Sequence, residues 1–179
     1  MPIEILNPHA ETYFDSIKKC NLIIYDITQD NSQLIEANKF LKHLEKHFDT
    51  NHETSESPKY FILISTIMTW SQTVISSEEP LTDSDYRKRR SHPCFMEHML
   101  LEREVMNAQK RHMQSLRTLI VCPGIIYGGK EDILHFIFKK CYFNKNQIET
   151  FAPGSNFIPI IYLQDFIKYS ISEFIKHKT

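Results

Sequence analysis

The sequence predicts an α/β protein built on a doubly wound parallel sheet. Three apolar, β-branched runs alternate along the chain with segments whose apolar residues recur at helical spacing. Runs that are apolar on both faces are typical of strands buried between two layers of helices. Strands that alternate with helices form parallel sheets with right-handed crossovers. We therefore expect three buried strands with helices packed on both faces.

The first half of the chain supplies two of these strands. Residues 22–27 and 60–65 are nearly continuous apolar runs and predict buried strands. Residues 3–6 form a shorter apolar run closed by Asn-Pro, which predicts a small strand. Residues 11–19 and 33–48 carry apolar side chains on one stripe, so we expect helices there.

The second half continues the alternation. Residues 119–122 predict the third buried strand, and residues 157–162 an extended segment. Helices are expected at residues 95–114, 133–143 and 163–176.

Two polar stretches separate these elements. Residues 49–58 predict a loop, and residues 72–93 are charged and punctuated by proline, which predicts a long surface excursion. Long loops inside compact domains are often functional.

Length, charge and cysteine spacing limit the class of protein. The chain has 179 residues, which suits one domain, and a formal net charge of -1, which gives no reason to expect nucleic acid as a partner. It contains no long apolar run and no secretory leader, so no membrane association is expected. Its cysteines lack metal-ligand spacing, which predicts reduced, mostly buried thiols in the cytoplasm: Cys20, Cys94, Cys122 and Cys141.

All four glycines lie in the second half of the chain, at Gly124, Gly128, Gly129 and Gly154. Nucleotide-binding α/β domains hold phosphates on glycine-rich turns, because only glycine lets the backbone approach the phosphate closely. Neither G-x-G-x-x-G nor G-x-x-x-x-G-K-[ST] occurs in the chain. We therefore expect no cofactor.

Three segments, residues 61–70, 122–128 and 154–165, resemble the extended short-chain dehydrogenase/reductase family, the NAD-dependent epimerases and dehydratases. The resemblance implies a Rossmann-like fold. In that family a strand ends in a Ser/Thr pair facing the substrate, and a proline-and-YG turn flanks the nicotinamide. The corresponding candidates for a vestigial cleft are Ser65, Thr66, Pro123 and Gly124.

The resemblance also implies a six-stranded core of order 3-2-1-4-5-6, with residues 3–6 as its third strand. The first strand, phosphate turn and helix then have no counterpart, so a single Rossmann-like domain at 1–179 is expected to be incomplete. The strand at 22–27 would lose its central neighbour and expose an apolar edge. Residues 3–6 could pair with it directly, a partner could supply the strand, or the chain is a partial product, which we favour.

Residues 63–70, 85–93, 134–139 and 156–161 together resemble, more closely, the amino-terminal domain of an axonemal adenylate kinase of motile cilia. This resemblance implies a cytoplasmic protein of the cilium whose partners are axonemal proteins or a chain of the same family. It also implies that kinase activity resides in a separate domain, which this sequence does not contain.

Hydride-transferring members of the dehydrogenase family use a Tyr and a Lys at i, i+4 on one helix, often followed by a Glu four residues later. Aligning that Glu with Glu102 places the Lys position at His98 and the Tyr position at Cys94. Neither has the required chemistry, and Thr66 alone is expected to be a structural hydrogen-bonding group. We expect these three positions to be degenerate and the chain to have no catalytic residues.

Tyr86 and Arg90 form another i, i+4 pair, but an always-charged Arg is a poor substitute for Lys, so we interpret Tyr86 as a solvated loop residue. The basic run at 87–90 is interpreted as a solvated face. Trp70 could stack on a ligand or plug the mouth of a cleft.

No metal site is expected. Among the polar residues of this region, His92, Glu97, His98 and Glu102 lack the H-E-x-x-H pattern and are interpreted as polar side chains exposed to solvent. A methionine series is interpreted as helix core: Met96, Met99, Met106 and Met113.

Together these observations predict a catalytically inactive, short-chain-dehydrogenase-like module that serves as an interaction or structural part of a ciliary protein. The alternative is an NAD(P)-dependent epimerase or oxidoreductase that uses Thr66, Tyr86 and an unconventional cofactor grip.

Overall fold

The computed structural model describes residues 12–50, 58–74, 81–129, 133–145, 147, 149, 154 and 157–176. The chain divides into two compact units, Met1–Val121 and Cys122–Thr179, and each is described by itself. The strand predicted at residues 3–6 lies outside the described residues.

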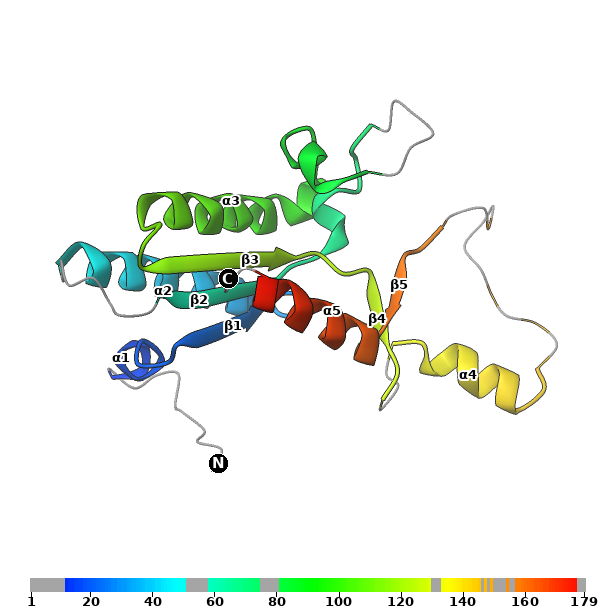
Figure 1. The fold of residues 1–179 in the computed structure, drawn as a ribbon. Coiled ribbons are helices and arrows are strands. Elements are labelled where there is room, and N and C mark those ends of the chain that lie inside the picture. Colours follow the sequence, from blue (N-terminus) through cyan, green and yellow to red (C-terminus); the bar gives the residue numbers. More distant parts are fainter. Residues whose placement is uncertain are drawn as a thin grey trace. The chain divides into compact units, whose positions relative to one another are not determined.

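The first unit is a three-stranded parallel sheet of order β1-β2-β3 (Figure 1). Its strands are β1 (Leu22–Asp26), β2 (Lys59–Ile64) and β3 (Leu116–Val121). The register pairs Ile23 with Phe61 and Phe61 with Thr118. The predicted alternation of parallel strands and helices is confirmed.

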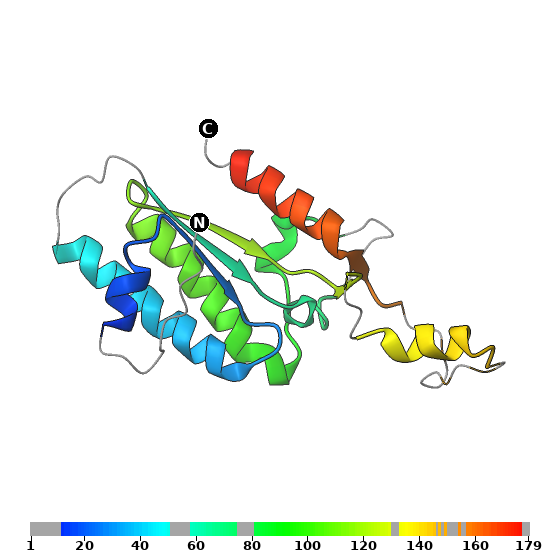
Figure 2. The same ribbon diagram turned by 90° about the horizontal axis from the view of Figure 1, so that it is seen from below.

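Three helices pack on one face of this sheet (Figure 2). They are α1 (Tyr13–Ile17), α2 (Asn31–Thr50) and α3 (Met96–Arg111). The core between α2, α3 and the sheet contains fully buried aromatic side chains, including Phe40 and Phe61. Helix α1 adds Phe14, whose ring centroid lies 5.6 Å from that of Phe40.

Strand β1 is buried on one face only. Ile23 and Tyr25 point into the core, whereas the alternate residues Leu22 and Ile24 are 42% and 54% exposed. The expectation that this apolar run is covered on both faces is therefore wrong for β1. In the described sheet β1 is also an edge strand, because β2 is its hydrogen-bonded neighbour and no other strand pairs with it there.

The second unit contains a two-stranded parallel sheet and two helices. Its elements are β4 (Ile125–Tyr127), α4 (His135–Tyr142), β5 (Ile160–Tyr162) and α5 (Leu163–Lys176). Strand β4 lies within residues 122–128, where only a turn was expected. The two helices agree with the sequence prediction. β4 and β5 pair from Ile125 and Ile160 onward.

Two predictions about individual side chains are wrong. Of the methionine series, only Met99 is buried among the described residues, while Met96 and Met113 are exposed at the ends of the helical region. The thiols of Cys20, Cys94 and Cys141 are exposed, and Cys122 is half-buried. Within the described ranges, no helix is long and apolar enough to cross a membrane.

Candidate functional site

The site lies at the carboxyl end of β2, the end of a parallel sheet where ligands bind in doubly wound folds. Ser65 and Thr66 follow the last residue of the strand directly. Thr66 is the N-cap of the short 3-10 helix η1 (Ile67–Thr69), and its Oγ1 accepts a hydrogen bond from the backbone N–H of Met68 at 3.2 Å. The Thr66 hydroxyl therefore caps a turn.

The excursion between η1 and α3 ends beside its own first residues. The backbone N–H of Gln72 donates to the carbonyl of Arg90 at 3.0 Å, and that of His92 donates to the carbonyl of Met68 at 3.1 Å. The N–H of Arg90 also donates to Thr73 Oγ1 at 2.9 Å. These bonds hold the two ends of the excursion side by side.

A buried carboxylate joins this excursion to the sheet and to α3. Glu102 is completely buried, and its Oε1 accepts a hydrogen bond from Ser65 Oγ at 2.5 Å. Its Oε2 accepts from Nη1 of Arg89, whose side chain is only 5% exposed. The Arg89 guanidinium lies over the Trp70 ring, 5.6 Å from its centroid. Because an unpaired buried charge is very costly, these partners are what permit Glu102 to remain in the interior.

The helix position of Glu102 explains why it is buried. His98, Leu101, Glu102 and Val105 recur on the stripe of α3 that faces the core. A carboxylate on such a stripe needs a buried partner, so the position of Glu102 in the sequence already indicated a buried cation. The cation that pairs with Glu102 is Arg89, one residue of the basic run at 87–90.

We predicted that the whole basic run at 87–90 is solvated, and this is wrong for one of its residues. Arg89 is buried against Glu102, whereas Arg87, Lys88 and Arg90 are exposed. The interpretation of His98 and Glu102 as solvent-exposed side chains is wrong as well, since both are buried. In the described part of the chain, no group of three or more His, Cys, Asp or Glu could hold a metal ion.

Cys94 and His98, at the positions that the resemblance implies for Tyr and Lys, lie in different surroundings. Cys94 belongs to η3 (Pro93–Phe95) and its side chain is exposed, while its backbone N–H donates to His92 Nδ1 at 3.2 Å. His98 is buried, with Nε2 3.2 Å from the carbonyl oxygen of Ile27. Among the described residues, no hydrogen bond joins Thr66, Cys94 and His98.

Tyr86, which we interpreted as a solvated loop residue, is hydrogen-bonded to Arg87. It lies in η2 (Asp83–Arg87), and its hydroxyl accepts a hydrogen bond from Arg87 Nε at 2.9 Å rather than from Arg90. The same guanidinium lies 5.6 Å from the ring centroid. This hydrogen bond lowers the pKa of Tyr86, which is half-buried on the excursion.

Pro123 and Gly124 belong to the second unit, where glycine has a packing role. A Cβ on Gly124 would lie 2.1 Å from the carbonyl oxygen of Pro159, so the two backbones approach each other too closely for any side chain. The N–H of Ile125 donates to that same oxygen at 2.9 Å. Gly128 has a φ of +100° and faces the Tyr162 ring. These glycines therefore make the β4–β5 contact possible.

The comparisons with known proteins place this geometry in a wider context. Over 159 residues, 82% of the chain, the sequence is 33% identical to adenylate kinase 7 of Mus musculus. This chain is related to a region of adenylate kinase 7. The chain spans only 24% of that protein's length. No protein-family model matches the chain. No solved structure matches it.

Proposed function

We propose that this chain is a catalytically silent module with a short-chain-dehydrogenase-like fold, which acts by binding proteins within an adenylate kinase 7-like protein. The observation that supports this most strongly is the environment of Glu102. Its two oxygens are engaged by Ser65 and Arg89 inside the protein, so the carboxylate holds the fold together. It is not directed at a substrate.

The groups at the expected catalytic positions do not replace the missing Tyr and Lys. Dehydrogenation in this family needs a phenol whose pKa is lowered by a neighbouring ammonium. Here an exposed thiol at Cys94 and a buried imidazole at His98 occupy those positions. The hydroxyl of Thr66 is engaged in capping η1.

The residues present do not fit NAD(P). The chain contains no glycine-rich phosphate turn, and the glycines of its second unit serve the β4–β5 contact. At the end of β2, Ser65 is fully buried and hydrogen-bonded to Glu102. We therefore derive no step through a nicotinamide cofactor.

We further propose that these residues do not carry adenylate kinase activity. The phosphate loop on which phosphoryl transfer depends, G-x-x-x-x-G-K-[ST], does not occur in the sequence. A coupled assay with ATP and AMP should detect no phosphoryl transfer by the purified chain. Conversion of ATP and AMP to ADP that is abolished by a single substitution in the chain would contradict this.

The axoneme of motile cilia is the proposed location, because the resemblance stated above is to an axonemal kinase. A fluorescently tagged chain expressed in multiciliated cells should accumulate along axonemes and co-purify with them after detergent extraction. A diffuse cytoplasmic signal that is lost on extraction would contradict this location.

Turnover assays separate this proposal from an unconventional NAD(P)-dependent epimerase. The purified chain, incubated with NAD(H) or NADP(H) and a panel of nucleotide sugars, should produce no change in nicotinamide absorbance. Turnover that disappears in Thr66→Ala or Tyr86→Phe would favour the epimerase. Exposed Tyr142→Phe serves as the control.

A further inference from the structure

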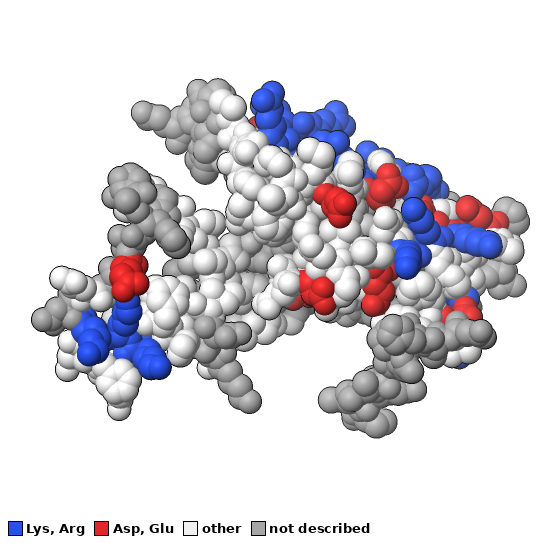
Figure 3. Space-filling model, turned by 180° about the vertical axis from the view of Figure 1, so that it is seen from behind, with Lys and Arg blue, Asp and Glu red and all other residues white. Residues whose placement is uncertain are grey.

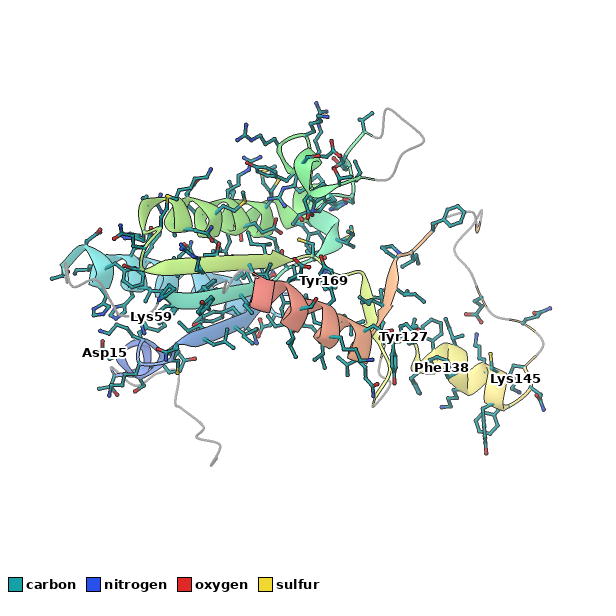
Figure 4. The ribbon with its side chains drawn as sticks, viewed as in Figure 1. Asp15, Lys59, Tyr127, Phe138, Lys145 and Tyr169 are labelled. Carbon is teal, nitrogen blue, oxygen red and sulfur yellow. The ribbon has the colours of Figure 1, made fainter. Side chains whose placement is uncertain are left out.

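Helix α4 in the second unit is a surface element that buries none of its own residues. Phe136, Phe138 and Tyr142 are 49%, 51% and 83% exposed, and Phe143 directly after the helix is 60% exposed. Exposed aromatic clusters of this kind mark binding surfaces. Figure 4 shows the side chains of α4 projecting from it, with Phe138 labelled.

An eight-residue helix that buries nothing needs a partner surface to be stable. Isolated helices shorter than about 12 to 15 residues are marginal in water, and most helical stability in proteins comes from packing of an apolar face. The aromatic side chains of α4 are available for such packing. This observation points to an occupant that covers the helix.

The aromatic residues are distributed around the helix and not along one stripe. Phe136 and Phe143 are seven positions apart and lie on one side, whereas Phe138 and Tyr142 are four positions apart and lie on another. A flat membrane surface contacts one face of a helix and leaves the opposite face polar. The pattern here favours a groove that encloses the helix.

The charge of this segment is strongly positive. Residues 135–145 contain three lysines, Lys139, Lys140 and Lys145, and no Asp or Glu. Lys140 contacts Glu149 at 3.4 Å, but Glu149 is 96% exposed, so this pair is a weak surface interaction. Figure 3 shows basic groups gathered at the lower left of the view, with an acidic group against them. An acidic partner matches this charge.

We propose that α4 is a docking helix for a calcium-loaded EF-hand protein, whose open groove is lined by methionine and rimmed by carboxylates. Such grooves enclose basic helices and accept aromatic anchors from more than one side. Phe136 and Phe143 supply the anchors, and Lys139 and Lys140 contact the acidic rim. The inference rests on the proposed protein-binding function and gives it a site and a class of partner.

Calorimetric titration of the purified 179-residue chain with calcium-loaded calmodulin tests the proposal. We expect saturable binding with a dissociation constant on the order of 10 µM or tighter, lost when calcium is chelated. Phe136→Ala/Phe143→Ala and Lys139→Glu/Lys140→Glu should each weaken binding by about tenfold or more, because aromatic anchors and complementary charges dominate such interfaces. Lys42→Glu/Lys46→Glu, the same charge change at two exposed positions on α2, should not alter it.

Several results would overturn the proposal. The first two are no saturable binding of calmodulin at concentrations up to roughly 100 µM, and equal binding with and without calcium. Calmodulin binding that neither α4 variant changes would also overturn it, as would binding of the chain only to vesicles of phosphatidylserine and phosphatidylcholine. Self-association through α4, seen by sedimentation and removed by Phe136→Ala/Phe143→Ala without any calmodulin binding, would also overturn it. Circular dichroism of each variant separates loss of binding from loss of fold.

A parallel titration with NADH and NADPH keeps the two proposals distinguishable. If calmodulin does not bind and the nucleotides do not bind either, the docking helix is rejected and the non-catalytic module stands. If the nucleotides bind, the proposed function fails whatever calmodulin does.

Discussion

Arg89 and Arg90 are neighbours in a run of four basic residues, but their environments differ completely. Arg89 is buried against Glu102 and the Trp70 ring, whereas Arg90 is exposed. The contrast arises because Glu102 lies on the core-facing stripe of α3 and requires a cation. The two residues therefore form a matched pair for measuring what this buried ion pair contributes.

Replacing Arg89 with leucine should destabilise the protein far more than the same change at Arg90. Arg89→Leu leaves a carboxylate buried without its cation, so we expect the free energy of unfolding to fall by about 3 kcal/mol or more. Arg90→Leu should change it by less than about 0.5 kcal/mol. Urea unfolding followed by circular dichroism measures both, and equal midpoints would show that the pair does not matter to stability.

Tyr13 of α1 and Tyr25 of β1 share one carboxylate, that of Glu36 on α2. The hydroxyls of Tyr13 and Tyr25 donate to Glu36 Oε1 at 2.7 and 3.1 Å. Burial, with the neighbouring negative charge of Glu36, raises the pKa of Tyr13 from 10.0 to about 12, and the pKa of Tyr25 is raised further. In each case the neutral phenol is the form that the folded state favours.

These shifts predict a loss of stability at alkaline pH. The unfolded state releases the tyrosine protons near pH 10.0, before the folded state does, so the stabilisation is complete below pH 10 and is lost as pH rises toward about 12. Tyr13→Phe should reduce this pH dependence, measured by urea unfolding across the window. Tyr142→Phe, at a residue that is 83% exposed, should leave it unchanged; identical slopes for wild type and Tyr13→Phe would contradict the assignment.

Residue-level prediction from the sequence failed where a distant partner decides the surroundings of a side chain. The degeneracy of Cys94 and His98, which rests on the family resemblance, stays a prediction. The burial of Arg89 could not be predicted, because a basic run is usually solvated and its partner is 13 residues away in the chain. The position of Glu102 on the core-facing stripe of α3 is the feature of the sequence that indicates a buried cation.

At the scale of elements, β1 is the least protected strand of the described sheet. It lies at the edge, and Ile24 is 54% exposed on it. Exposed apolar edge strands pair with other chains and promote aggregation. Ile35 on α2 has the same exposed fraction, 54%, but its backbone belongs to a helix.

Introducing a lysine at Ile24 should therefore reduce self-association. Ile24→Lys places a charge on the edge strand, where it blocks pairing with another strand, and light scattering should show less aggregate at a given concentration. Ile35→Lys adds the same charge at equal exposure and should have a much smaller effect. Equal effects of the two substitutions would indicate that general solubility, and not the strand edge, is responsible.

The close backbone approach at Gly124 gives a second prediction at this scale. Gly124→Ala puts a Cβ 2.1 Å from the Pro159 carbonyl oxygen, so β4 and β5 must move apart. Overpacking of this kind costs about 1 to 3 kcal/mol. Hydrogen exchange of the Ile125 amide, which donates to that oxygen, should become faster; unchanged exchange would contradict the close contact.

The elements themselves were largely predictable, and their exceptions have physical causes. Continuous apolar runs located β1, β2 and β3, because short runs rich in β-branched and aromatic residues and bounded by polar segments are typical of buried strands. The exposed face of β1 was not predictable, since a strand's sequence does not show which layers cover it. The three-residue β4 was missed because it is too short to show a period.

At the scale of the whole molecule, the chain combines a parallel sheet with a sequence that has a net charge of -1 and no glycine-rich phosphate turn. At the carboxyl end of β2, Ser65 and Arg89 hold the Glu102 carboxylate inside the protein. The relationship to a region of adenylate kinase 7 covers 82% of the chain. Our central claim is that this scaffold is retained for binding proteins.

Calorimetric titration of the purified chain with NADH and NADPH tests that claim most directly. The account predicts no saturable heat for either nucleotide, with an active short-chain dehydrogenase as the positive control. Binding on the order of 10 µM or tighter, abolished by Thr66→Ala or His98→Ala in a variant that still folds, would contradict it.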